Sequence, residues 1–223
     1  MSKPYSPLPW SYSALTSFET CPRKHYHLRV AKDVVEPQGE AAMWGDTVHK
    51  AIEARIKNKT LLPKGMEKWE RVASKFDTPK GLLFTEERFA LTKNMQPCKW
   101  GATDCWTRGI IDIGVDAGEK VFLGDWKTGK VKHDLDQLKL FAGLYMQTKL
   151  YVKKVKTAFI WLAHNKVTKE EFTREDLPEI WGDFTARARR LEVTAQQNKW
   201  PPKPSGLCKA WCHVMTCEFN GRR

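Results

Sequence analysis

Apolar residues recur along the chain at two spacings, one typical of helices and one typical of strands. Val48, Ile52 and Ile56 repeat every fourth residue, which predicts a helix within residues 37–58 that has one apolar side. The sequence Thr-Pro-Lys-Gly at 78–81 is expected to break the chain before the first strand. The other elements expected in this half are a short helix from about Ser11 or Ser13, a helix over 65–76 and a strand over 82–91.

The most regular passage covers residues 108–129, where two β-rich runs flank a turn-like Asp-Ala-Gly-Glu sequence. This pattern predicts a β-hairpin. If the turn is centred between Gly118 and Glu119, Asp112 of the first strand lies directly opposite Asp125 of the second.

Three more elements are expected after the hairpin. An amphipathic helix is predicted over residues 134–150, a buried strand over 155–162, and then a long helix that is capped near Thr173. The order is therefore helix, three strands, helix, strand, helix. The residues expected to face the core are Leu135, Leu138, Ala142 and Tyr145 on the first of these helices, and Leu177, Trp181, Phe184, Ala188, Leu191 and Ala195 on the second.

The chain is expected to form one main domain with a small appendage. The sequence holds no internal repeat, and its first Pro-rich stretch lies at residues 201–206. We therefore predict a domain over residues 1–205 and a Cys-rich cap over residues 206–223. No run approaches the roughly 18 apolar residues of a membrane span, and the opening residues lack the apolar stretch of a signal peptide. These features predict a cytoplasmic protein, in the host cytoplasm if the source is viral.

The composition adds a candidate partner. Of the 223 residues, 41% are hydrophobic and 29% are charged, which indicates a folded globular protein. The net charge of +12 favours a polyanion as the partner, with nucleic acid ahead of an anionic membrane surface. The alternative is that the charge serves only solubility. The ten tryptophans favour nucleic acid slightly, because indole rings stack on bases, although most tryptophans are ordinary core residues.

The predicted pairing of Asp112 with Asp125 indicates a candidate binding site for a divalent cation. Residues directly opposite each other in an antiparallel pair have Cβ atoms about 5 Å apart, so two carboxylates there repel unless a cation lies between them. A hard cation such as Mg²⁺ would turn this repulsion into a binding site. Strand alternation also puts Lys127 on the same side as Asp125. The alternative is an exposed hairpin that merely carries these three charges.

These residues also match a known family. Gly109-Ile-Ile-Asp112, followed after the turn by Asp125-Trp-Lys-Thr-Gly129, resembles the G-x-x-D and D-x-K-[ST]-G signatures of the PD-(D/E)XK nuclease superfamily, in its RecB-type branch. The resemblance implies an α/β (α+β) fold with a restriction-endonuclease-like core of helix, three mostly antiparallel strands, helix and strand, to which extra helices and the Cys-rich cap are added.

Three further motifs fit the same branch. Gly45, His49 and Glu53 resemble its G-x-x-x-H-x-x-x-E helix, which implies His49 as a metal ligand; a packing histidine is the alternative. Glu87 matches the family's acidic residue on the first core strand, although a solvated strand glutamate would look the same. Gln137 lies where the family has Gln-x-x-x-Tyr.

The chain departs from that last motif, because the tyrosine position is Phe141. Tyr145 lies one turn further along and could substitute, although a tyrosine on such a helix is ordinarily a core residue.

The resemblance implies a divalent-metal-dependent DNA nuclease, most simply an exonuclease of recombination or DNA processing. Asp112, Asp125, His49 and the Trp126 carbonyl would hold Mg²⁺ or Mn²⁺, helped by Glu87. Lys127 would orient or activate the attacking water. The expected partners are single- or double-stranded DNA, at its ends, and recombination or processing proteins. A subunit that binds nucleic acid or acts as a scaffold without cleaving is the alternative. The candidate phosphate contacts are Lys130, Lys132 and Lys139, followed by Arg187 and Arg190.

A second metal site is expected at the end of the chain. Cys208, Cys212 and Cys217 lie within ten residues, which in a reducing compartment favours metal over disulfides. With Cys21 they resemble the four cysteines that hold a [4Fe-4S] cluster in CRISPR-adaptation and AddB-type nucleases, although the spacing differs. Structural Zn²⁺ is the alternative, held by these four cysteines or by the last three with His213. Three reduced thiols without metal are a further alternative. Cys98 and Cys105 are expected to be ordinary free thiols.

Overall fold

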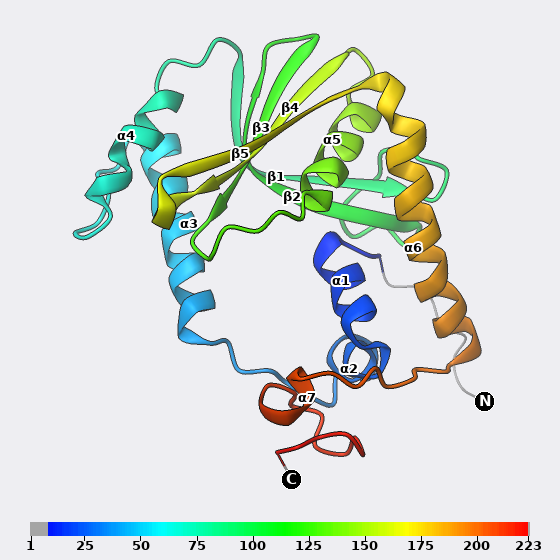
Figure 1. Cartoon of the computed structure of the whole chain (residues 1–223). Coiled ribbons are helices and arrows are strands. Elements are labelled where there is room, and N and C mark those ends of the chain that lie inside the picture. Colours follow the sequence, from blue (N-terminus) through cyan, green and yellow to red (C-terminus); the bar gives the residue numbers. More distant parts are fainter. Residues whose placement is uncertain (1–8, 223) are drawn as a thin grey trace. The chain divides into compact units, whose positions relative to one another are not determined.

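The computed structural model describes residues 9–222 (Figure 1). The described chain forms two compact units, one made of residues 9–38 and 182–222 and the other of residues 39–181. The cysteines of the predicted cap and Cys21 belong to the first unit. Within residues 9–222, no helix has the length and the apolar character that a membrane span requires.

The second unit contains a sheet with the strand order β1-β2-β3-β4-β5. Neighbouring strands are antiparallel except β3 and β4, which are parallel. Helix α5 (Asp136–Thr148) makes the crossover that a parallel pair requires. The predicted order of helix, three strands, helix and strand is confirmed. The strands are β1 (Leu82–Thr92), β2 (Cys105–Asp116), β3 (Lys120–Lys127), β4 (Lys154–Trp161) and β5 (Lys166–Thr173).

Strand β5 was not predicted from the sequence. Its residues, Lys-Val-Thr-Lys-Glu-Glu-Phe-Thr, are exposed or half-buried except for Phe172, because β5 is an edge strand that pairs only with β4 among the described strands. An edge strand needs little apolar surface and carries charges that oppose further pairing. The hydrophobic pattern therefore gave no signal there.

The hairpin of β2 and β3 has the predicted register, but its ladder ends at Ile113 and Gly124, one residue before the predicted pair of Asp112 and Asp125. Ile113 pairs with Gly124, and the pairing continues to the turn, where Asp116 pairs with Val121. Beyond Ile113 and Gly124 the two strands separate, although β2 extends back to Cys105 and β3 runs on to Lys127. Figure 1 shows β1 and β2 bending near their middle, away from the line of β3. The sheet therefore divides beyond Ile113 and Gly124, and we call this point the fork.

The bend is accompanied by a break in the alternation of β1. Phe84 and Phe89 both contact the ring of Tyr145 on α5, although regular alternation would put residues five apart on opposite faces. Between them, Glu86 has a φ of 51°, in the left-handed region that strand residues rarely adopt. Alternation therefore reverses at Glu86.

The other face of the sheet is covered by α3 (Glu40–Asn58), whose Val48, Ile52 and Ile56 are fully buried as predicted. They pack in one cluster with Ile113. The predicted helix over 65–76 is a run of short turns made of η2 (Glu67–Trp69), α4 (Glu70–Ala73) and η3 (Ser74–Phe76). Trp69, Ala73 and Phe76 from this run join the same cluster.

Helix α5 is buried on more sides than a surface helix. Leu138, Ala142 and Tyr145 are buried as predicted, and so is Gly143. A side-chain carbon at Gly143 would lie 3.1 Å from Ile180, at the start of α6 (Leu177–Gln197), so this side of α5 is covered as well. The helix is therefore a central element of its unit.

The first unit gathers short N-terminal helices with the later part of α6. Phe184, Ala188, Leu191 and Ala195 are buried as predicted, and Trp10 stacks on Phe184 with ring centroids 5.9 Å apart. The other helices of this unit are α1 (Tyr12–Thr20), which Ser11 caps, α2 (Pro22–His25), the π-helical η1 (Tyr26–Ala31) and α7 (Leu207–Ala210).

Arg187 and Arg190, which were predicted as possible phosphate contacts, both pair with Glu19 of α1. Arg187 is buried, with Nε 2.8 Å from the Glu19 carboxylate. This ion pair joins α1 to α6 within the unit. The sequence pattern could not show it, because the partners are far apart along the chain.

His25 makes the first unit sensitive to acid. Its ring stacks on Trp200 and meets the edge of Phe18, and this burial, together with Arg29, lowers its pKa from 6.5 to about 4. A histidine that stays neutral when folded stabilises the protein above pH 6.5, and that stability is lost as the pH falls toward 4. We expect about 2–3 kcal/mol of unfolding free energy to be lost between pH 7.5 and 4.5 through this group.

Urea unfolding followed by tryptophan fluorescence at several pH values measures this loss. His25→Phe keeps an aromatic ring on Trp200 and should flatten the pH dependence, whereas His164→Gln, on an exposed turn, should leave it as steep as in the wild type. Equal pH dependence of His25→Phe and wild type would contradict the assignment.

Candidate active site

Asp112 and Asp125 lie where β2 and β3 separate, and both are buried. Beyond the last ladder pair, Asp112 replaces a backbone partner with its side chain: Oδ2 accepts the N–H of Trp126 at 2.9 Å. A carboxylate thereby holds the two strands together at the point where the sheet opens. Both carboxylates are kept in a region with little water, where charge interactions are strong.

His49 reaches the same point from α3. Its Nε2 lies 2.8 Å from the Trp126 carbonyl oxygen, and its Nδ1 lies 3.3 Å from Oδ2 of Asp112. Gly45, one turn earlier, allows the helix to come this close, because a side-chain carbon there would lie 3.3 Å from Oγ1 of Thr128. The spacing of the glycine and the histidine therefore has a packing reason.

Glu86 completes a set of metal-ligand atoms. Among the described residues, His49, Glu86 and Asp112 form a group of three whose ligand atoms all lie within 4.8 Å of one another. The Trp126 carbonyl touches the same histidine, and Glu53 lies near enough to affect Glu86 electrostatically. Two carboxylates, an imidazole and a carbonyl match the ligands of Mg²⁺ and Mn²⁺.

The charges of this group are not balanced by the protein itself. Burial and the neighbouring Asp125 raise the pKa of Asp112 well above its usual value. Burial also raises the pKa of Glu86, with Glu53 and Asp125 adding to the effect. A bound divalent cation would reverse this repulsion. The residues present therefore fit such an ion, on the chemistry of the donors and on their uncompensated charge.

Lys127 and Gln137 surround Asp125. The ammonium of Lys127 lies 2.6 Å from Asp125 Oδ2 and donates to Gln137 Oε1 at 3.0 Å. The Gln137 amide donates in turn to Asp125 Oδ1 at 2.8 Å. The ring of Phe159 lies 5.0 Å from the ammonium. These contacts hold Lys127 in one orientation beside the acidic group.

A comparison with known protein families shows which family this chain belongs to. Residues 9–219 match the family model of the PD-(D/E)XK nuclease superfamily. The chain belongs to the PD-(D/E)XK nuclease superfamily. A comparison with curated proteins finds no significant match.

Two solved structures share the fold of this PD-(D/E)XK protein. The structure of SSO0001 has 16% sequence identity to this chain and a TM-score of 0.51. The alignment covers 98% of this chain and 90% of the SSO0001 chain. A "Putative exonuclease" from Eubacterium rectale is 12% identical with a TM-score of 0.53, covering 90% of this chain and 85% of its own. At these identities the likeness extends to the fold, and the predicted PD-(D/E)XK fold class is confirmed.

The structure brings most of the predicted PD-(D/E)XK site residues together, with one exchange. Glu86, and not Glu87, lies with His49 and Asp112. Glu87 faces the α5 side, where its charge contributes to the raised pKa of Tyr145 and Tyr151. Sequence reasoning missed Glu86 because it had no means to detect the left-handed residue at which alternation reverses.

Two other predicted features take different positions. The hydroxyl of Tyr145, the possible substitute for the missing motif tyrosine, donates to Asp116 at 2.7 Å and so lies outside the acidic group. Asp125 also lies outside the set of three, although its charge acts on Asp112.

The three candidate phosphate contacts lie after the site in the chain. Lys130 and Lys132 are exposed in the connection between β3 and α5. Lys139 lies on the first turns of α5 and forms a 4.0 Å ion pair with Asp136. The first two leave their ammonium groups available to solvent and so to an anion.

The cysteines of the predicted second metal site gather in the first unit. Their sulfurs receive backbone N–H groups: Lys203 N lies 3.4 Å from Cys21 Sγ, and Ser205 N lies 3.4 Å from Cys208 Sγ. Hydrogen bonds of this kind stabilise thiolate ligands of metal centres. The four cysteines that line this one small cavity are Cys21, Cys208, Cys212 and Cys217.

His213, which was the alternative to Cys21 as the fourth zinc ligand, does not line that cavity and lies 3.5 Å from Glu36 instead. Cys98 and Cys105 are free thiols of the other unit, and burial raises the pKa of Cys105 to about 11. A thiol with a raised pKa is a poor metal ligand at neutral pH.

The repulsion in the acidic group gives a stability prediction. The pKa of Asp112 is raised in the folded state, so its ionised form costs stability as the pH rises above the ordinary aspartate value. In EDTA at pH 7.5, Asp112→Asn should therefore raise the melting temperature by about 2–4 °C or more. The amide oxygen still accepts the Trp126 N–H.

Added Mn²⁺ should stabilise the wild type more than Asp112→Asn. At 100 times its Kd the ion should stabilise the wild type by about 2.7 kcal/mol, and it should stabilise Asp112→Asn far less. Asp104→Asn, which removes an exposed carboxylate, is the control and should behave as the wild type does. A lower melting temperature of Asp112→Asn in EDTA would show that the carboxylate is not under repulsion.

Proposed function

We propose that this protein is a divalent-metal-dependent deoxyribonuclease that hydrolyses phosphodiester bonds, as an exonuclease of recombination or DNA processing. One observation carries the proposal: His49, Glu86 and Asp112 offer ligand atoms within 4.8 Å of one another beside Lys127, in a chain of the PD-(D/E)XK superfamily. The exonuclease mode rests on the likeness to the Eubacterium rectale protein, whose structure is titled "Putative exonuclease", and on the resemblance to RecB-type nucleases.

Mg²⁺ or Mn²⁺ would be held by His49, Glu86, Asp112 and the Trp126 carbonyl, with Asp125 available from the facing strand. Such an ion lowers the pKa of bound water and neutralises charge on a phosphate. The protein's part is to keep these ligands close together and partly shielded from water: Asp112 and Asp125 are buried where β2 and β3 separate, and His49 and Glu86 are half-buried.

Lys127 is the group proposed to act on the reacting atoms. Its ammonium, fixed by Asp125 and Gln137, can donate to the attacking water or to a phosphate oxygen as negative charge develops. Gln137 is a positioning residue, because it touches Asp125 and Lys127 and holds both. The nearby ring of Phe159 excludes water from one side of the ammonium.

DNA is the proposed substrate because of the charge of the protein and the family. The net charge of +12 favours a polyanion. Lys130, Lys132 and Lys139 follow the site along the chain and are the proposed first phosphate contacts. Recombination or processing proteins remain proposed partners.

Cleavage of labelled single- and double-stranded DNA in Mg²⁺, Mn²⁺ or EDTA tests the enzyme. We expect cleavage with either ion and none in EDTA. Asp125→Ala, Lys127→Met and Glu86→Gln should each lower the rate by about 100-fold or more, as is usual when a group that stabilises the transition state is lost. Glu87→Gln removes the same charge one residue away and should stay within about threefold of the wild type.

The result also separates the enzyme from its alternative. Wild-type protein that binds DNA but cleaves it with neither ion would instead be a non-cleaving binding or scaffold subunit. Cleavage that persists in Asp125→Ala would remove the proposed site. Equal losses in Glu86→Gln and Glu87→Gln would remove the assignment of Glu86.

We further propose that Cys21, Cys208, Cys212 and Cys217 hold a [4Fe-4S] cluster. The support is that all four line one cavity and that backbone N–H groups point at two of the sulfurs. Structural Zn²⁺ on the same four sulfurs is the second candidate, since zinc also accepts four thiolates.

Anaerobically purified protein should be brown and absorb broadly near 400 nm. Cys21→Ser should lower the melting temperature, because lost ligation is lost folding free energy. Cys98→Ser, in the other unit, is the control and should keep the colour. Colourless protein with stoichiometric zinc would replace the cluster by zinc, and an unchanged melting temperature of Cys21→Ser would remove Cys21 from the ligands.

A further inference from the structure

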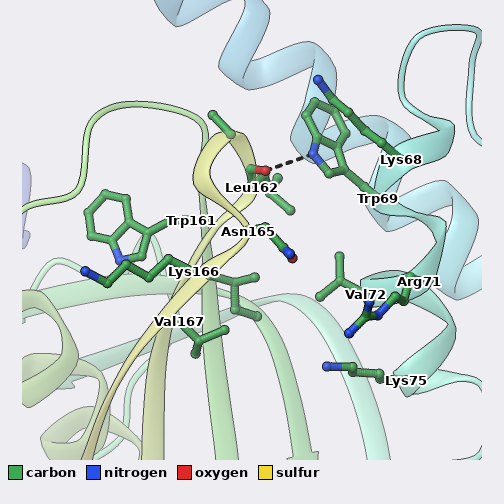
Figure 2. Close-up of a pocket in the computed structure, with 12 residues that line it drawn as sticks. Lys68, Trp69, Arg71, Val72, Lys75, Trp161, Leu162, Asn165, Lys166 and Val167 are labelled. Atoms are coloured by element: carbon green, nitrogen blue, oxygen red, sulfur yellow. Dashed lines mark hydrogen bonds between the residues drawn. The ribbon is translucent and has the colours of Figure 1, made fainter.

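A cavity of about 350 Å³ lies in the second unit, between the helical run of residues 67–76 and the turn that joins β4 to β5 (Figure 2). It is separate from the acidic group, whose residues do not line it. Pockets of this size hold ligands as large as a drug molecule. The cavity is therefore large enough for one nucleotide.

The rim of the cavity is cationic. Lys68, Arg71 and Lys75 follow one side of the helical run at spacings of three and four residues. Lys166, at the start of β5, also lines the cavity, but its ammonium points toward Trp161 and away from Arg71 and Lys75 (Figure 2). No carboxylate is among the lining residues in the described chain. Figure 2 shows the Arg71 and Lys75 side chains directed to the cavity.

The acidic residues of the same segment point elsewhere. Glu70 and Asp77 both bond to Arg55 of α3, Asp77 at 2.9 Å. Asp77 also pairs with Lys59. As a result, Arg71 and Lys75 form no ion pair with any described residue. Positive charges that stay unpaired in one hollow favour an anion.

The floor of the cavity is apolar and fixed. Val72, Ile160 and Leu162 line it, and the indole N–H of Trp69 donates to the Leu162 carbonyl oxygen at 3.1 Å. This bond ties the helical run to the end of β4 (Figure 2). Because the bonding groups are buried, this hydrogen bond fixes the positions of the two walls even without a ligand.

The cavity lies beside the proposed active site. In the parallel pair of β3 and β4, Trp126 is the register partner of Ile160, and Lys127 that of Trp161. Ile160 and Trp161 both line the cavity. Adjacent strands are about 4.8 Å apart, so the cavity begins one strand away from Trp126, whose side chain lies with Ile160 on the α3 side of the sheet and whose carbonyl oxygen contacts His49. The Lys127 side chain lies on the α5 side, against Gln137 and Phe159.

We propose that this cavity binds an unpaired nucleotide of a single-stranded nucleic acid whose cleaved phosphate lies at the group of His49, Glu86 and Asp112. The phosphates contact Arg71 and Lys75, and the base and sugar rest on the apolar floor. A base of a duplex is paired and stacked, so it cannot enter such a hollow without being extruded. The inference rests on the proposed nuclease function and names single strands as its substrate class.

Fluorescence polarisation with a fluorescein-labelled 20-mer of thymidylate, in EDTA to prevent cleavage, tests the proposal. The variant Arg71→Gln/Lys75→Gln should bind about tenfold more weakly or worse. The slope of log K against log salt should fall by about 1.4, since each single-strand phosphate contact contributes about 0.7. The control Lys80→Gln/Lys120→Gln removes two exposed charges of the same unit and should stay within about twofold of the wild type.

Two results would overturn the proposal. One is equal weakening by the two double variants, which would reduce the effect to net charge. The other is displacement of the 20-mer by poly-glutamate as effectively as by unlabelled thymidylate, which would mean that the cavity takes any polyanion. Binding in EDTA does not depend on catalysis, so a wild type that fails to cleave removes the nuclease and leaves this binding site, while equal weakening removes only the binding site.

Discussion

The separation of β2 and β3 beyond Ile113 and Gly124 is the constraint on which the site depends. When the two strands part, backbone groups lose their ladder partners, and the Asp112 carboxylate takes up one of them, the Trp126 N–H. That bond keeps Asp112 buried within reach of the charge of Asp125, at a cost in repulsion that raises its pKa. The protein accepts a locally unfavourable arrangement here, as proteins do where ligands must be held ready.

The remaining structure supports this point from two directions. Helix α3 brings His49 to Asp112, because Val48, Ile52 and Ile56 fix its apolar side against the sheet. Helix α5 brings Gln137 to Asp125 and Lys127 from the other side of the fork. Both helices are anchored by extensive burial, so the polar groups they carry have little freedom. Packing of the two helices therefore fixes the positions of His49 and Gln137 beside the acidic residues.

Ion pairs within the protein also determine which positive charges remain unpaired. Arg55 is buried on α3 and pairs with Glu70 and Asp77. Because these carboxylates are paired with Arg55, the cations of the helical run remain unpaired beside the cavity next to β4. Arg187 is likewise matched by Glu19, so this positive charge serves the packing of its own unit. The net charge of +12 therefore does not spread evenly. Pairing removes some cations from the surface, and those left unpaired mark where we propose that an anion binds.

The sequence alone determined what local and periodic signals carry: the hairpin and its register, the apolar sides of α3 and α6, and the motif of Asp112, Asp125 and Lys127. These depend on residues that are near in sequence or repeat regularly. Only the tertiary structure decided that Glu86 and not Glu87 joins the site, that Arg187 is paired, and that β5 completes the sheet edge. Each of these depends on a backbone reversal or on a partner distant in the chain, and alternation in the sequence records neither.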